Sequence, residues 1–193
     1  MNSIKTAVSL YSYQDEFARG KLSLEDCLQE LSQQGIAGVE LISDQMLRNA
    51  PFVSDEDVAN WKELITKYNL FPACNDIFIN TKLYRNRLLT QKENIQLLKN
   101  ELILANKLGF KLVRLVSLTP TDIIEEVLPL AEELDVVMAL EIHGGMGLDH
   151  PESKKFIDIM FKVNSPYLGL VVDTGFFVAG IHAYLLSFFL IRA

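Results

Sequence analysis

The chain has 193 residues, 49% of them hydrophobic, which is enough apolar material for one core of ordinary domain size. Its formal net charge of −7 leaves no broad basic face to neutralise a phosphate backbone, and this argues against nucleic-acid binding. Two cysteines are too few for a disulfide framework, and the first residues match no secretory signal, so we expect a reducing, cytoplasmic setting.

Short apolar, β-branched runs alternate with helical patterns along the chain. The runs begin near Thr6, Gly38, Leu70, Lys111, Val136 and Leu168. The helical patterns between the first four runs begin after Ser23, an N-cap candidate, and at Ser54 and Thr90. Gly35 and Gly109 supply helix stops. This alternation predicts right-handed strand–helix–strand units that build a parallel sheet.

Two later helical patterns contain prolines. One opens near Pro120 and includes Pro129, which we expect to kink or shorten the helix, and the other opens at Pro151. The strand starts recur at the spacing of the units in a (β/α)8 TIM barrel. We therefore predict an α/β fold of that type, incomplete, with about six units over residues 1–175. A doubly wound open sheet is the alternative, but no G-x-G-x-x-G motif follows the first run.

Residues 176–193 form an apolar tail. From Phe176 to Ile191, His182 is the only ionisable side chain. The stretch is shorter than the roughly 20 residues that a helix needs to cross a bilayer, so a membrane span is not expected. A buried or interface-forming helix and a tail that is not native-like both remain open.

Polar side chains stand at the ends of two neighbouring predicted strands. In "LEIHGG", Glu141 and His143 are two residues apart and so point to one side of a strand, at the end where barrel enzymes place catalytic groups. Asp173 ends the next strand. Two carboxylates at adjacent strand ends can share one divalent metal. The structural alternatives are a hydrogen-bonded rim carboxylate with a solvated histidine, and an aspartate that caps the following segment.

Other strand ends add weaker candidates. Glu40, Asn75 and Arg114 would join the same rim as substrate contacts, although each is equally typical of a solvated or salt-bridged residue. Cys27 and Cys74 are expected to be buried apolar fillers rather than reactive thiols.

The motifs "GVEL", "LEIHGG" and "VVDTG", in this order and register, resemble the xylose isomerase-like TIM barrels, also called the sugar phosphate isomerase/epimerase superfamily. The resemblance covers about residues 4–177. It implies a divalent metal, Mn²⁺, Mg²⁺ or Co²⁺, held by Glu141 and Asp173 with a histidine and a glutamate from two further strands. It also implies that Glu141 moves a proton beside the carbonyl of a carbohydrate while His143 contacts substrate oxygens.

The resemblance therefore implies a metal-dependent sugar or sugar phosphate isomerase or epimerase. A catalytically incomplete remnant or partner subunit is an alternative, as is a lyase or C-glycoside deglycosidase of the same barrel class. Many family members have a histidine where this chain has Phe176, and we expect the chain to be truncated before strands seven and eight. A six-strand arc has open edges, which the tail or a second copy of the chain could cover as a homo-oligomer.

Overall fold

The structure, a computed structural model, describes residues 5–116 and 119–174. The predictions for the apolar tail, including Phe176 and His182, fall outside these residues. Within the described ranges, no helix combines the length and the apolar character that crossing a bilayer requires.

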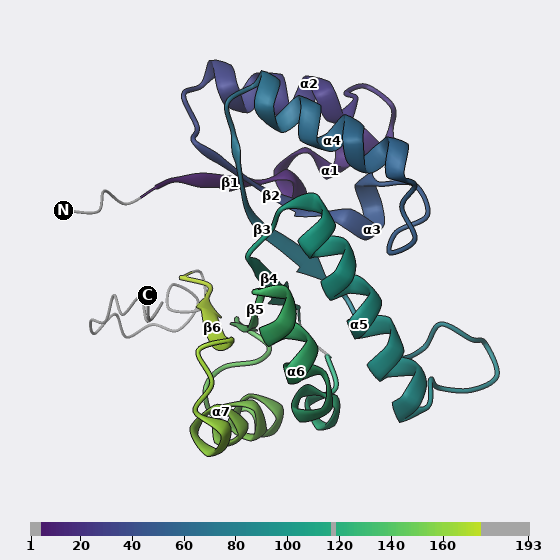
Figure 1. Ribbon diagram of the computed structural model, residues 1–193, viewed down its shortest axis with the longest axis vertical. Helices are drawn as coiled ribbons and strands as arrows, with labels where there is room; N and C mark the ends of the chain where they lie inside the picture. The colour runs from purple at the N-terminus through teal and green to yellow at the C-terminus, as the bar shows by residue number, and fades with distance from the viewer. Residues whose placement is uncertain (1–4, 117–118, 175–193) are drawn as a thin grey trace. The chain divides into compact units, whose positions relative to one another are not determined.

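Strands alternate with helices along the described residues, as predicted (Figure 1). The strands are β1 (Ala7–Ser9), β2 (Gly38–Ile42), β3 (Phe71–Ile77), β4 (Leu112–Leu115), β5 (Val137–Ile142) and β6 (Leu168–Val172). The α-helices are α1 (Gln14–Ala18), α2 (Leu24–Gln33), α3 (Ser43–Met46), α4 (Asp55–Lys67), α5 (Gln91–Leu108), α6 (Ile124–Leu134) and α7 (Pro151–Val163). Two 3₁₀ turns, Leu10–Tyr13 and Thr121–Ile123, precede α1 and α6. The order of the strands in the sheet follows their order in the chain.

Local chemistry sets the helix boundaries. Ser23 caps α2 in a capping box, in which its hydroxyl accepts from the Asp26 amide at 3.1 Å and the Asp26 carboxylate accepts from the Ser23 amide at 2.8 Å. Ser54 caps α4 in the same position. Gly109 ends α5 at a φ of +90°, a backbone conformation that glycine adopts without a steric penalty. The predicted starts and stops of these helices are confirmed.

Helix α6 differs from its prediction. It runs without interruption from Ile124 to Leu134 although it contains Pro129. The proline removes one amide donor, yet the apolar side chains on both sides of it, Val127, Leu128 and Ala131, are buried. Burial of this face keeps the helix together, because tertiary packing can outweigh a local helix-breaking residue.

The described residues divide into two compact units. The first contains residues 5–77 with 100–113, and the second contains 78–99 with the described residues from 114 onward. In the first unit, β1, β2 and β3 pair in parallel, and in the second, β5 pairs in parallel with β6.

Aromatic packing and one close backbone approach organise the first unit. Trp61 on α4 stacks on Phe110 with ring centroids 5.7 Å apart, and its indole N–H donates to the Leu108 carbonyl at 3.0 Å. In the sheet, the ring of Phe71 lies over Gly38, where a Cβ would come within 2.6 Å of it. Gly38 is therefore needed for this contact between β2 and β3.

Polar contacts join the helices of the second unit near the surface. Lys162 on α7 pairs with Glu125 on α6 at 2.7 Å. The Thr121 hydroxyl donates to Glu152, in the first turn of α7, at 2.7 Å. Helix α7 begins with Pro151 at its first position, as predicted, and is capped by the ring of His150, which accepts from the Glu152 amide at 3.3 Å.

Candidate functional site

The end of β5 carries a paired acidic side chain. Glu141 lies on β5 and Arg114 on β4, and Nη1 of Arg114 is 3.2 Å from Oε1 of Glu141. Only 20% of the arginine side chain and 13% of the glutamate side chain are exposed. A guanidinium–carboxylate contact with this little solvent fixes the direction of the carboxylate. Arg114, predicted as a substrate contact, therefore holds Glu141 in place in this structure.

His143 follows β5 in a tight turn. Its Nδ1 accepts from the Gly145 amide at 3.2 Å, and its carbonyl accepts from the Met146 amide at 2.9 Å. Ser153 on α7 then donates to the Met146 carbonyl at 3.3 Å. Because Nδ1 acts as an acceptor, the neutral ring carries its proton on Nε2. Nε2 is buried and has no hydrogen-bond partner among the residues described, so this donor is left for another group.

Asp173 lies just beyond β6, next to the end of β5. Its amide donates to the Ile142 carbonyl at 2.9 Å, and Glu141 pairs with Val171 in the parallel register. Since side chains alternate along a strand, Asp173 points to the same face as Val171 and hence as Glu141. Asp173 is exposed. The two carboxylates predicted as metal ligands thus share one face of two adjacent strands.

A second polar group lies in the first unit, on β2 and β3. Glu40, predicted at a strand end, is the middle residue of β2. Glu40, Cys74 and Asp76 have side-chain ligand atoms that all lie within 4.8 Å of one another. Cys74 and Asp76 are each 6% exposed, while Glu40 is half-buried. Cys74 is opposite Glu40 in the sheet, and Asp76 is opposite Ile42, two residues further along. One thiol and two carboxylates make a donor set typical of Zn²⁺ more than of Mg²⁺.

Asn75 faces the other way. It pairs with Leu41, which is fully buried, so it lies on the opposite face of β3 from Cys74 and Asp76. Asn75 is itself fully buried, and neither its amide nitrogen nor its oxygen has a hydrogen-bond partner among the described residues. The structure therefore does not bring Asn75 together with Glu40, and its role in substrate binding stays a prediction.

Two polar residues escaped the sequence interpretation. Cys74 is buried, as expected of a filler, but it also belongs to the Glu40 group, and its alternation with Asp76 was the signal for this. Glu101 on α5 is 5% exposed, and burial, followed by the nearby Asp44 charge, raises its pKa from 4.5 to about 7. Its position directly before the apolar residues of "LILA" was the only sign in the sequence.

Residues 28–182, most of the chain, match the model of a protein family described as the xylose isomerase-like TIM barrel. The chain belongs to this family. Its six described strands alternating with helices are those of an incomplete barrel of the (β/α)8 type, so the predicted fold and the predicted family are confirmed.

Curated relatives of this barrel chain are subunits of deglycosidases. The chain is 31% identical over 183 residues to a C-glycoside deglycosidase alpha subunit of Arthrobacter globiformis. The aligned region covers 93% of this chain and 50% of that protein. The chain is 27% identical to the 3'-dehydrocarminate deglycosidase alpha subunit of a Microbacterium species, covering 89% of this chain and 49% of that protein. The chain thus spans about half the length of these relatives.

Solved structures share the fold at low sequence identity. D-psicose 3-epimerase, determined in the presence of D-fructose, matches with a TM-score of 0.67 and 10% identity over 93% of this chain and 67% of that one. The IOLI protein with a bound zinc atom matches with a TM-score of 0.66 and 20% identity over 90% of this chain and 64% of that one.

The two residues predicted as metal ligands, Glu141 and Asp173, come from neighbouring strands of the second unit. Glu141 and Asp173 offer hard carboxylate oxygens from one face of adjacent strands, the type that Mn²⁺ and Mg²⁺ prefer. Arg114 contacts one oxygen of Glu141, and a carboxylate has a second. The residues present are therefore compatible with a divalent metal at this position.

Proposed function

We propose that this barrel chain is part of an alpha-type subunit of an enzyme that releases the aglycone from a C-glycoside whose sugar carries a ketone. The observation that carries the proposal is the set of Glu141, His143 and Asp173 at the ends of β5 and β6. It is supported by the chain's similarity to two deglycosidase alpha subunits over about nine-tenths of its length. One of these relatives is named for a 3'-dehydro glycoside.

The chemistry begins with a weak carbon acid. In a 3'-keto sugar, the proton on the carbon between the ketone and the anomeric carbon is acidified by the carbonyl. The Glu141 carboxylate, held by Arg114, takes this proton. The electron pair then forms a double bond to the anomeric carbon as the bond to the aglycone carbon breaks. The products are an unsaturated keto sugar and an aglycone that must gain one proton at the released carbon.

His143 is the candidate proton donor to the leaving aglycone. Its Nδ1 is occupied by the Gly145 amide, so its Nε2–H is the donor that can contact an aglycone oxygen or protonate the released carbon. A divalent metal held by Glu141 and Asp173 would polarise the sugar carbonyl and so make its neighbouring proton easier to remove.

Epimerisation of a ketose, or isomerisation of a sugar or sugar phosphate, is the second candidate. It shares the first step, proton removal beside a carbonyl, and differs in that the proton returns to the sugar and no carbon–carbon bond breaks. The same Glu141, held in the same way by Arg114, would perform that first step. The two functions therefore differ in product rather than in the residue that starts the reaction.

The relatives' names also bear on assembly. Both are alpha subunits, which supports a further proposal that this chain works beside a different subunit. A homo-oligomer is the alternative, and the two states give different masses in solution.

A product assay tests the proposed function. Purified protein with Mn²⁺ is incubated with a 3'-keto C-glycoside and, separately, with a panel of ketoses and sugar phosphates, and products are separated by chromatography. We expect free aglycone, with a loss of about a hundredfold or more in the Glu141→Gln variant. Glu133→Gln, at an exposed position on α6, is the matched control and should keep the activity. Epimer without aglycone would establish the second candidate, and equal turnover by Glu141→Gln would contradict both.

A further inference from the structure

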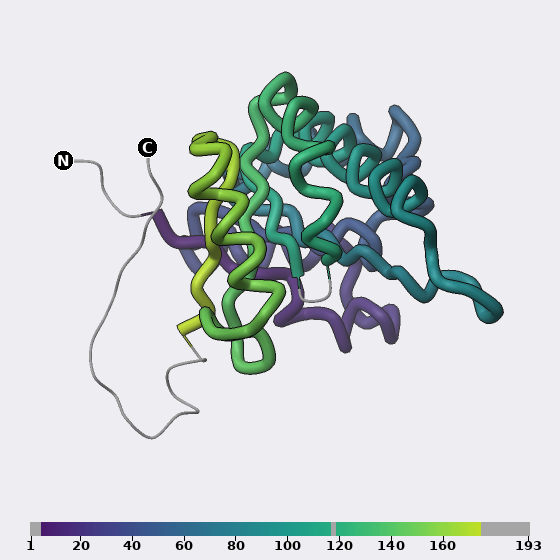
Figure 2. The backbone as a smooth tube through the Cα atoms, turned by 90° about the horizontal axis from the view of Figure 1, so that it is seen from below, coloured from purple at the N-terminus to yellow at the C-terminus, as the bar shows by residue number. Residues whose placement is uncertain are grey.

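The loop between β3 and α5 carries three cations and several exposed apolar side chains. Residues 80–90, called the 80–90 loop below, leave and return at one place, because the Leu89 amide donates to the Thr81 carbonyl at 2.8 Å. Asn80 shapes its start, accepting from the Lys82 amide through its side chain at 3.0 Å. Figures 1 and 2 both show this segment as an arm that extends from the beginning of α5. Such compact loops with adjoining ends are frequently functional.

One cation of the loop is used internally. Arg87 forms two hydrogen bonds to Glu93 at 2.7 and 2.8 Å, and its guanidinium lies 4.3 Å from the centre of the Tyr84 ring. Glu93 also accepts from the Thr90 amide at 2.8 Å. These contacts, with the Arg87 hydrogen bond first among them, lower the pKa of Glu93 to about 2. Arg87 therefore ties the loop to the first turn of α5 and organises it before anything binds.

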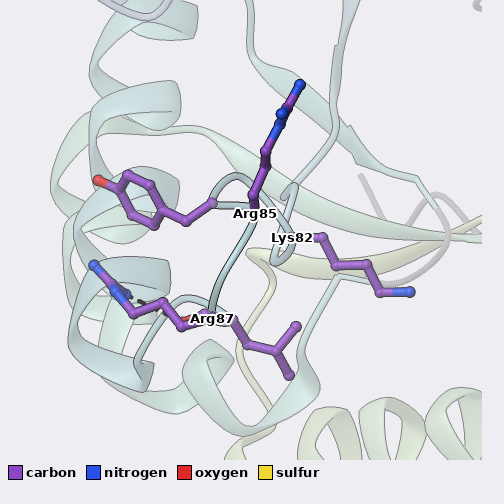
Figure 3. Close-up of a pocket in the computed structure, with 5 residues that line it drawn as sticks. Lys82, Arg85 and Arg87 are labelled. Carbon is purple, nitrogen blue, oxygen red and sulfur yellow. Dashed lines mark hydrogen bonds between the residues drawn. The ribbon is translucent and has the colours of Figure 1, made fainter.

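Two further cations of the loop point outward. Lys82 and Arg85 are exposed, and neither side chain forms an ion pair with any described residue. Between Asp76 and Glu93 the sequence contains no acid, in a chain whose net charge is −7. Figure 3 shows the side chains of Lys82, Arg85 and Arg87 pointing in different directions around the pocket. Divergent cations cannot close together on one small anion, but they can meet separate charges on an extended surface.

Large apolar side chains accompany these cations. Leu83 is 59% exposed, Tyr84 46% and Leu88 60%. Tyr84 and Leu88 line a hollow of about 410 Å³ together with the three cations. Exposed apolar groups rimmed by charge are typical of protein interaction sites, since their burial by a partner is favourable.

We propose that the 80–90 loop docks an acidic segment, carrying apolar side chains, of a non-identical partner subunit. This inference uses one part of the proposed function, namely that the chain works beside a different subunit. Charge complementarity supports this choice: acidic groups would meet Lys82 and Arg85, and apolar groups would enter the hollow beside Leu88. A second copy of the chain fits less well, because two chains of net charge −7 repel each other on approach.

Fluorescence anisotropy tests the proposal with a labelled peptide of glutamate, aspartate and leucine, titrated with the full chain. We expect binding that weakens as salt is added. The double variant Lys82→Glu with Arg85→Glu should weaken binding by about tenfold or more. The Leu88→Ser variant should weaken it about fivefold at low and high salt alike. The matched control, Lys21→Glu with Lys62→Glu, changes the net charge equally at exposed positions outside the loop and should bind as the unmodified protein does.

Four results would overturn the proposal. They are no peptide binding by the unmodified protein, equal loss in the control variant, displacement of the peptide by millimolar inorganic phosphate, and self-association in sedimentation velocity that the loop variant abolishes. The first two results would mean that the 80–90 loop does not bind an acidic segment. The third would mean that it binds a small anion, and the fourth that it binds a second copy of the chain. Glu141→Gln should leave peptide binding unchanged, so a failure of the proposed function and a failure of this surface give different results.

Discussion

Two glutamates with little solvent exposure, one in each compact unit, are held in different ways. Glu101, on α5 in the first unit, is 5% exposed, and its Oε2 has no hydrogen-bond partner among the described residues. Burial and the nearby Asp44 charge raise its pKa to about 7. Glu141, on β5 in the second unit, lies 3.2 Å from the Arg114 guanidinium. Removing water makes the first carboxyl hold its proton, while a fixed cation makes the second a directed carboxylate.

The largest expected effect comes from removing the charge at Glu101. The folded pKa of about 7 lies above the ordinary 4.5, so the folded state binds this proton more tightly than the unfolded chain does. Its stabilising contribution is fully present below pH 4.5 and is lost as the pH rises through about 7. Glu101→Gln should therefore raise the free energy of unfolding at pH 8 by up to about 3 kcal/mol and leave it unchanged near pH 4.

Urea unfolding of both proteins across this pH range checks the prediction. The matched control is Glu133→Gln, at an exposed position on α6, for which the difference from the unmodified protein should not vary in this way. A Glu101→Gln difference that is the same at pH 4 and pH 8 would contradict the unpaired state of Glu101.

In the second unit, we expect a substitution in the Arg114–Glu141 pair to lower the stability, whereas Glu101→Gln raises it. Arg114→Gln leaves a mostly buried carboxylate without this partner and should lower the free energy of unfolding by about 2 kcal/mol. Arg114 has other interactions as well, so the double variant Arg114→Gln with Glu141→Gln is needed to isolate the pair. We expect a coupling energy of about 1 kcal/mol or more from this cycle. A coupling near zero would mean that Arg114 does not hold Glu141.

The smallest effect on stability is expected from an ion pair at the surface. Lys67 and Glu25 join α4 and α2 at 2.6 Å, but about half of each side chain is exposed. Solvent screens such a pair, so Glu25→Gln should change Tm by less than about 2 °C. Calorimetry at low and high salt checks this, and a larger change that persists in high salt would show that exposure is a poor guide to the strength of these pairs.

The sequence was sufficient for much of the fold, for physical reasons that are local. Capping at Ser23 and Ser54, the stop at Gly109 and the β-branched runs depend on neighbours within a few residues, so they can be recognised without a structure. Pro129 shows the limit of this approach. We expected this proline to kink or shorten the helix, but α6 stays intact because its apolar face is buried, and that burial depends on residues far away in the chain.

The candidate site could be predicted only in part. The apolar runs that end near Glu141 and Asp173 predicted two neighbouring strand ends. The face that these two side chains share depends on the parallel register of β5 and β6, which is seen only in the structure. The partner of Glu141 could not be foreseen, because Arg114 belongs to another strand and only the fold brings them together. The same holds for Cys74 beside Glu40. Asn75 shows that a polar residue at a strand end can face away from its neighbours.

Calorimetric titration of Mn²⁺ tests most directly whether Glu141 and Asp173 form a metal centre. The unmodified protein should bind the ion, and Glu141→Gln and Asp173→Asn should each weaken binding by about tenfold or more. Glu40→Gln, which removes a carboxylate from the other polar group, should bind as the unmodified protein does. No binding by the unmodified protein, equal binding by all the variants, or a loss confined to Glu40→Gln would contradict this metal centre.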